Sequence, residues 1–120
     1  MARKRSRTRL IVDAGGTLAV ASIADRPLAR MVGLLGRRGL AAGDGLVIRP
    51  CYAIHTWFMR FPIDVLFLDE AGSVLRAVEA LPPFRFASGG RHARVTVELP
   101  AGTLRRFAVA PGARLRMAPA

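Results

Sequence analysis

The side chains that could carry chemistry are concentrated in one short stretch, residues 51–69. It contains the only cysteine, Cys51, and the only tryptophan, Trp57, of the 120-residue chain, together with His55. A cysteine and a histidine are the pair that a thiol enzyme uses as nucleophile and base. Cys51, His55 and Met59 are also three soft ligands spaced four residues apart, of the kind that copper(I) prefers. Both thiol chemistry and metal binding are therefore hypotheses to test against the local structure.

The predicted local structure argues against both hypotheses. The residues on either side of Pro62 are largely apolar, aromatic or β-branched, which predicts two strands separated by a break at the proline. Residues four apart in a strand are about 13 Å from each other, whereas a base must lie about 3 Å from its nucleophile. Only a sharp bend between Cys51 and His55 would bring them together. We therefore predict no metal and no cofactor, and we keep the thiol enzyme as an alternative.

The same residues could instead form a binding groove. In a strand, His55, Trp57 and Met59 would share one face, which could hold a planar or apolar ligand. That face could equally be a core stripe, the interpretation that we favour for Met59. Arg60 would neutralise an anionic group of the ligand or partner, and Phe84 would contribute from a loop. The candidate groove residues are Cys51, His55, Trp57, Arg60, Asp64 and Phe84.

Two acidic residues, Asp64 and Glu98, lie between apolar residues of predicted strands. Asp64 is surrounded by apolar residues, so we expect it to be buried, where an isolated charge would be unfavourable. Arg60, four residues earlier, is the predicted partner, and a general-base role for Asp64 is the alternative. Glu98 belongs to an alternating apolar strand, and we expect it to point to solvent or to pair with an arginine.

Short β-rich runs separated by glycine and proline turns predict an α+β domain. We expect a β-rich, partly closed antiparallel barrel or sheet with one or two short helices, in which the apolar central run lies inside the sheet. Residues 1–7 are predicted to form a basic disordered arm, and residues 8–120 a single domain. The first two strands should form a hairpin, and residues 81–90 a loop that could act as a lid or rim. The predicted strands cover residues 8–12, 17–23, 46–49, 54–59, 63–69, 73–80, 95–99 and 113–117, with helices beginning at Asp25 and at residue 103.

The chain is strongly basic, with a net charge of +11 carried by 18 arginines and a single lysine. Five of these 19 basic residues lie within the first nine positions. Such a charge favours non-specific attraction to nucleic acid, so a nucleic-acid-associated protein is an alternative function. An arginine-rich source genome would produce the same composition. The sequence does not specify a ligand, a partner or an oligomeric state.

The chain contains no apolar run that would serve as a secretory or membrane-spanning segment. A signal peptide needs about 7–15 uninterrupted apolar residues and a membrane helix about 20. The first apolar run is broken at Asp13 and again at the following glycines. One cysteine cannot form an internal disulfide, which suits a reducing compartment. We therefore expect a cytoplasmic location.

Three motifs of the chain resemble those of the bacterial and archaeal domain-of-unknown-function family 192. They are Gly-Leu-Leu-Gly-Arg at 33–37, the run from His55 to Asp69, and Val-Glu-Leu-Pro-Ala-Gly at 97–102. The resemblance extends from about residue 20 to residue 117. It implies a compact β-rich domain, often exported or membrane-anchored elsewhere in the family, with no established enzymatic activity.

This chain departs from the family pattern at Ala113, where the preceding glycine is often followed by Asp, and at Phe84, where Trp is common. We also expect no export signal, unlike in the exported relatives. Taken together, the residues and the resemblance favour a non-catalytic binding or accessory module.

Overall fold

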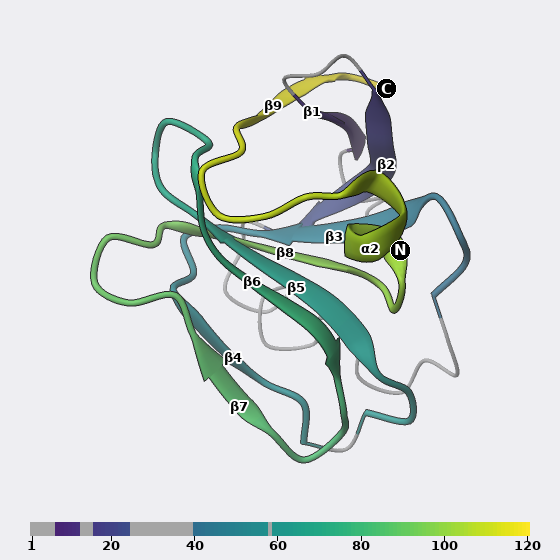
Figure 1. The fold of residues 1–120 in the computed structure, drawn as a ribbon, viewed down its shortest axis with the longest axis vertical. Coiled ribbons are helices and arrows are strands. Elements are labelled where there is room, and N and C mark those ends of the chain that lie inside the picture. Colours follow the sequence, from purple (N-terminus) through teal and green to yellow (C-terminus); the bar gives the residue numbers. More distant parts are fainter. Residues whose placement is uncertain (1–6, 13–15, 25–39, 58) are drawn as a thin grey trace, which may run out of the picture.

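The computed structural model describes residues 7–12, 16–24, 40–57 and 59–120 of the chain. The helix predicted to begin at Asp25 lies outside these residues, as does most of the turn between the first two strands. The described helix is α2 (Thr103–Phe107), and the described strands are β1 (Arg7–Val12), β2 (Thr17–Ala24), β3 (Asp44–Ile48), β4 (Ala53–His55), β5 (Ile63–Leu68), β6 (Val74–Leu81), β7 (Phe86–Ser88), β8 (Val95–Pro100) and β9 (Leu115–Pro119) (Figure 1).

Seven of these strands form one curled sheet in the order β6-β5-β8-β3-β2-β1-β9. All neighbouring pairs are antiparallel except β2–β3, which is parallel. The two edge strands approach each other at their first residues, where Leu115 N donates to Gly72 O at 2.8 Å. Gly72 has a φ of +85°, and a Cβ atom there would collide with the Leu115 carbonyl. The predicted partly closed, β-rich architecture is therefore confirmed.

Each face of the sheet packs against its own hydrophobic core, because side chains of the central strands alternate between the faces. On β5, Leu66 points into a first core that also contains Leu104 of α2, whereas Val65 and Phe67 point into a second core. Both faces of β5 are thus buried, and β5 lies between β6 and β8 as predicted for the central run.

The second core is covered by a separate two-stranded antiparallel sheet, β4–β7, which we call the ribbon. Ile54 of β4 pairs with Ala87 of β7, and both side chains are buried against the main sheet. Just after β7, Gly89 packs so closely on Phe67 that an added Cβ would lie 2.4 Å from the Phe67 Cβ. A glycine therefore allows the end of the ribbon to rest directly on β5.

The structure confirms most predicted strands and corrects two of them, together with one predicted loop. The paired strands β1 and β2 confirm the predicted hairpin partners. The strand predicted over 54–59 is wrong, because β4 ends at His55 and a turn follows. The predicted loop over 81–90 contains β7, and the last strand begins at Leu115 rather than at residue 113. The extent of β4 and the presence of β7 are set by the pairing of these two strands with each other, which local β-propensity does not reveal.

Candidate functional site

Exposed aromatic rings lie on the ribbon and on the residues directly beside it. Phe86 is 64% exposed, Tyr52 61%, Phe84 54% and Trp57 43%. His55 is also exposed and is the cross-strand partner of Phe86. The buried pair Ile54 and Ala87 takes the inner face, so strand alternation directs His55 and Phe86 outward. We call Tyr52, His55, Trp57, Phe84 and Phe86 together the aromatic surface.

Hydrogen bonds beyond the end of the ribbon hold this surface in place. The Thr56 side chain is fully buried, and its Oγ1 donates to Pro82 O at 2.6 Å and accepts from Arg85 N at 2.9 Å. Thr56 O accepts from Phe84 N at 3.0 Å. Because Thr56 is adjacent to Trp57, these bonds bring Trp57 and Phe84 to the same end of the ribbon.

His55 and Trp57 contact each other directly. Their ring centroids are 5.4 Å apart with the planes at 73°, an edge-to-face arrangement. The Trp57 backbone N–H donates to His55 Nδ1 at 3.2 Å. This bond fixes the imidazole orientation and leaves Nε2 as the nitrogen that can donate outward when the ring is neutral.

The structure does not assemble the thiol site. Cys51 is partly buried against the second core, and its Sγ donates to the Ala53 carbonyl at 3.2 Å. No hydrogen bond joins Cys51 to the imidazole of His55 among the described residues. Met59 is buried in the second core, as we favoured, and does not share the exposed surface of His55 and Trp57. In the described part of the chain, no three His, Cys, Asp or Glu side chains come together as metal ligands do.

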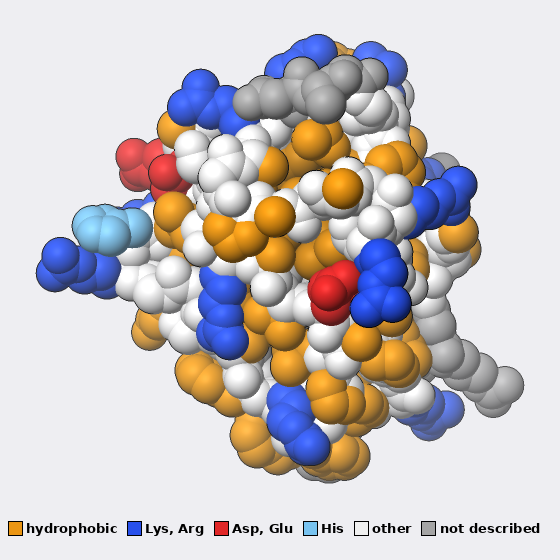
Figure 2. All heavy atoms as spheres, viewed as in Figure 1, with side chains coloured by type: hydrophobic (Ala, Val, Ile, Leu, Met, Phe, Trp, Pro, Cys, Tyr) orange, Lys and Arg blue, Asp and Glu red, His pale blue; other side chains and the backbone are white. Residues whose placement is uncertain are grey.

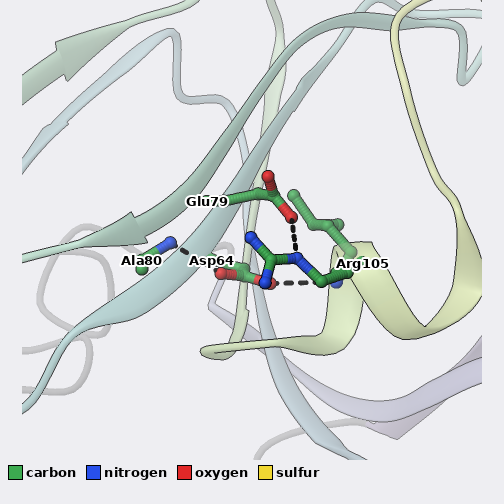
Figure 3. A network of polar contacts seen from close by, with 5 residues as sticks. Asp64, Glu79, Ala80 and Arg105 are labelled. Atoms are coloured by element: carbon green, nitrogen blue, oxygen red, sulfur yellow. Dashed lines mark hydrogen bonds and ion pairs between the residues drawn. The ribbon is translucent and has the colours of Figure 1, made fainter.

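Asp64 lies on the opposite face of the sheet from the ribbon, on the side of α2. It is fully buried; Oδ1 accepts from Ala80 N at 2.8 Å and Oδ2 from Leu104 N at 2.9 Å (Figure 3). The predicted clamp between Arg60 and Asp64 is wrong, because backbone amides satisfy the carboxylate and Arg60 is exposed. Asp64 thus caps the first turn of α2, whose own N-cap is Gly102 with no capping side chain.

The same carboxylate stabilises a bulge in β6. Ile63 pairs with Leu81 and Val65 with Val78, so two residues of β6 lie opposite Asp64. One of them is Ala80, whose φ of 49° is unusual for a residue other than glycine. An exposed ion pair, Arg105 with Glu79 at 3.7 Å, lies beside this site. Asp64 therefore has a structural environment and no opening toward a ligand among these contacts.

Glu98 is buried, contrary to our prediction. It lies on β8 between Leu46 of β3 and Val65 of β5, both members of the second core, and is only 5% exposed. Its Oε2 has no hydrogen-bond partner in the described structure. Burial raises the pKa of Glu98 to about 7. The central position of β8 explains the error, since a strand paired on both sides and covered on both faces has no solvent-facing residues.

Glu98 is a functional candidate that sequence reasoning missed. It shares a sheet face with the ribbon, because Thr96, two residues earlier on β8, donates from Oγ1 to Cys51 O at 3.2 Å. A buried carboxyl that titrates near neutral pH is a frequent property of functional sites. The only sequence signal for it was that Glu98 interrupts an otherwise uncharged strand.

Basic residues lie on the same segments of the chain as the aromatic surface and beside β7. Arg60 and Arg85 are exposed, and Arg76 of β6 donates from Nη1 to Ser88 O at 2.8 Å, next to the other end of β7. Figure 2 shows hydrophobic and basic side chains gathered at the end of the molecule where Figure 1 places β4 and β7, whereas the acidic side chains in that view lie elsewhere. The ribbon therefore combines apolar rings with positive charge.

A separate hollow of about 580 Å³ lies between β2, the Pro100–Gly102 turn and α2. It is bordered by Thr103, Arg106 and Phe107, and the Arg106 guanidinium lies 5.5 Å from the Phe107 ring centroid. None of the predicted groove residues borders it. The structure thus brings Cys51, His55, Trp57 and Phe84 to the ribbon and separates Asp64 from them.

Residues 10–117 match the model of domain-of-unknown-function family 192, described as "Uncharacterized ACR". The chain belongs to this family. The match confirms the resemblance seen in the motifs and begins about ten residues earlier, within β1. The family 192 domain matches none of the curated proteins with which it was compared. Among the residues that the structure describes, no helix has the length and apolar character required to cross a membrane.

Two solved structures are similar to this family 192 domain. One, from Sinorhizobium meliloti 1021, is described as "a putative transcription regulator"; it is 27% identical with a TM-score of 0.82, and the match covers 98% of this chain and 96% of that one. The other, from Novosphingobium aromaticivorans DSM 12444, is described as a protein of unknown function. It is 16% identical with a TM-score of 0.78 over 92% of this chain and 83% of the other, and shows the fold alone.

Proposed function

We propose that this family 192 domain is a non-catalytic binding module whose ligand or partner docks on the aromatic surface of the ribbon. The observation that carries the proposal is the exposure of four large aromatic side chains, Tyr52, Trp57, Phe84 and Phe86, on and beside one two-stranded sheet. Clustered exposed apolar surface is a common mark of an interaction site. Aromatic rings are also efficient contact residues, because they have few rotatable bonds.

The rigidity of the ribbon supports the same proposal. Its inner side chains, Ile54 and Ala87, are buried in the second core, and Thr56 is held by hydrogen bonds at the end that carries Trp57. A docking surface on such a scaffold loses little conformational freedom when it binds. The nearby arginines favour a ligand that carries negative charge as well as planar or apolar groups.

The thiol enzyme receives no such support. A catalytic cysteine needs a base within hydrogen-bond reach of its sulfur. Cys51 Sγ instead donates to Ala53 O, and His55 Nδ1 accepts from the Trp57 backbone N–H. In our proposal both residues support the ribbon rather than perform chemistry.

A cytoplasmic location stays a prediction, in keeping with the single free cysteine.

A nucleic-acid-associated role is the second candidate. It is favoured by the net charge of +11 and by the description of the S. meliloti structure, which refers to transcription. This role would use the same surface if the negative charge of the ligand were phosphate.

The proposal can be tested with anilinonaphthalene sulfonate, a planar, apolar and anionic fluorescent probe. We expect saturable binding to the native protein. The dissociation constant should rise about tenfold or more for Trp57→Ala and for Phe86→Ala, which corresponds to a loss of about 1.4 kcal/mol of binding free energy. Phe107→Ala is the matched control, because Phe107 is an exposed ring on α2. Circular dichroism would establish that all variants are folded. Equal binding by the ribbon variants and the control would contradict the proposal.

A further inference from the structure

We propose that the aromatic surface binds single-stranded nucleic acid, with unpaired bases stacked on its rings and phosphates held by the surrounding arginines. The inference rests on the proposed function of the ribbon and specifies the ligand. It is argued from the charge of the ribbon, from the kind of hydrophobic side chain that it exposes, and from the placement of those side chains on both ribbon segments.

The charge of the ribbon is uniformly positive. The two segments that form it and its flanks, residues 49–63 and 82–95, contain no Asp or Glu. Arg76 adds a further cation through its hydrogen bond to Ser88 O. A polyanion would therefore meet no repulsive side chain from these segments. The arginines of the two segments are Arg49, Arg60, Arg85, Arg91 and Arg94.

The exposed hydrophobic side chains of the ribbon are all aromatic. Among the described residues, the large aliphatic side chains that are well exposed, Leu75 and Met117, lie on β6 and β9 instead. A surface that inserts into lipid commonly uses aliphatic as well as aromatic residues. A surface that binds single strands needs flat rings on which bases stack, interspersed with cations for the phosphates. Arg85 lies in sequence between Phe84 and Phe86, which provides that combination.

Each of the two ribbon segments carries exposed rings. His55 and Trp57 lie on one segment in edge-to-face contact with each other, and Phe84 and Phe86 lie on the other segment. Unpaired bases can stack on the outward faces of such rings, whereas the bases of a duplex are not accessible for stacking.

The test is a fluorescence-anisotropy titration of the full chain with a labelled oligothymidylate of about 16 nucleotides, the upper end of the site size of one single-strand-binding domain. We expect the single strand to bind at least about tenfold more tightly than a duplex of equal length, and to quench the fluorescence of Trp57, the only tryptophan. Phe86→Ala should weaken binding about tenfold. Phe107→Ala, the matched aromatic control, should leave it unchanged.

The arginines provide an independent readout. The logarithm of the affinity should fall linearly with the logarithm of the salt concentration, and Arg85→Ala should lower that slope by about 0.7, the value for one phosphate contact with a single strand. Arg116→Ala is the matched control, since Arg116 is exposed on β9 at the far edge of the sheet. Equal affinity for duplex and single strand, or an affinity unchanged by Phe86→Ala, would overturn the inference. Binding would then result from charge attraction alone.

The outcomes separate this inference from the proposed function. If the probe dye still depends on Trp57 and Phe86 but the oligonucleotide does not bind, the ribbon is a binding surface with another ligand and the inference is wrong. Ribbon-dependent binding to anionic phosphatidylserine vesicles without oligonucleotide binding would likewise overturn the inference, in favour of a membrane surface as the partner. If the ribbon substitutions change the affinity for neither the dye nor the oligonucleotide, the proposed function is wrong as well.

Discussion

Asp64 and Glu98 are carboxyl groups on adjacent strands of one sheet, buried on opposite faces, and the structure accommodates them in opposite ways. Asp64, on β5, accepts hydrogen bonds from the backbone amides of Ala80 and Leu104. Glu98, on β8, has an Oε2 with no partner in the described structure. Removal of a charge from water is unfavourable unless hydrogen bonds or a proton compensate. Asp64 is compensated by hydrogen bonds, whereas the raised pKa of Glu98 points to compensation by a proton.

This difference separates a structural residue from a residue available for function. Asp64 joins three elements, since β5 carries it and it bonds to β6 and α2. Its hydrogen-bonding capacity is directed to the fold. Glu98 stabilises no neighbouring element by hydrogen bonding among the described residues, and it lies on the face of the sheet that the ribbon covers. Substitutions at the two sites should therefore have different consequences, and those at Glu98 should depend on pH.

The largest effect is expected for Asp64→Ala. The substitution leaves the buried amides of Ala80 and Leu104 without an acceptor, and each unsatisfied group costs about 1–3 kcal/mol. We expect the free energy of unfolding, measured by urea denaturation at neutral pH, to fall by about 2–5 kcal/mol. Asp64→Asn keeps the shape but replaces one acceptor oxygen by a donor, so it should lie between wild type and Asp64→Ala. A loss below about 1 kcal/mol would show that these bonds do not stabilise the bulge and helix.

A smaller, pH-dependent effect is expected for Glu98→Gln. The pKa of Glu98 is raised from 4.5 to about 7, so its stabilising contribution is fully present below pH 4.5 and is lost as the pH rises to about 7. That shift corresponds to about 3 kcal/mol. Glutamine does not titrate, so the stability of Glu98→Gln relative to wild type should rise by roughly this amount across the same window. Urea denaturation at several pH values measures it, and parallel profiles for the two proteins would show that Glu98 is not the titrating group.

The smallest effect is expected for Arg105→Ala. Its ion pair with Glu79 is solvent-exposed, with side chains 83% and 50% accessible at 3.7 Å. Pairs of this kind contribute about 0–1 kcal/mol. A thermal melt should therefore be almost unchanged, and what change there is should disappear at high salt. A loss as large as that of Asp64→Ala would mean that the ion pair shields the buried carboxylate and that the two cannot be treated separately.

Sequence patterns correctly predicted those elements whose residues carry a strong local signal. Residues 8–12, 17–23 and 63–69 are rich in β-formers, and the strands β1, β2 and β5 follow them closely. Ribbon strand β7 was missed because prolines and glycines lie on both sides of its three residues. Those residues form a strand only because β4 pairs with them, a contact between distant parts of the chain.

The candidate site was partly predictable for the same reason. The concentration of Trp57, His55 and Cys51 was visible in the sequence, and all three lie on or beside the ribbon. Their grouping with Asp64 assumed a continuous surface, but the sheet separates Asp64 from them. Phe86 could not be recognised without its cross-strand partner His55.

By itself, then, the sequence determined the family, the β-rich fold class and the stretch of chain that carries the aromatic surface, because motif, propensity and composition are local properties. Only the tertiary structure decided which face of the sheet each side chain occupies. The alternation of side chains along a strand gives two possible faces, but the burial of each face depends on the elements that pack against it. That is why Glu98, expected in solvent, is buried without a partner, and why Asp64, expected beside an arginine, is held by the backbone of two other elements.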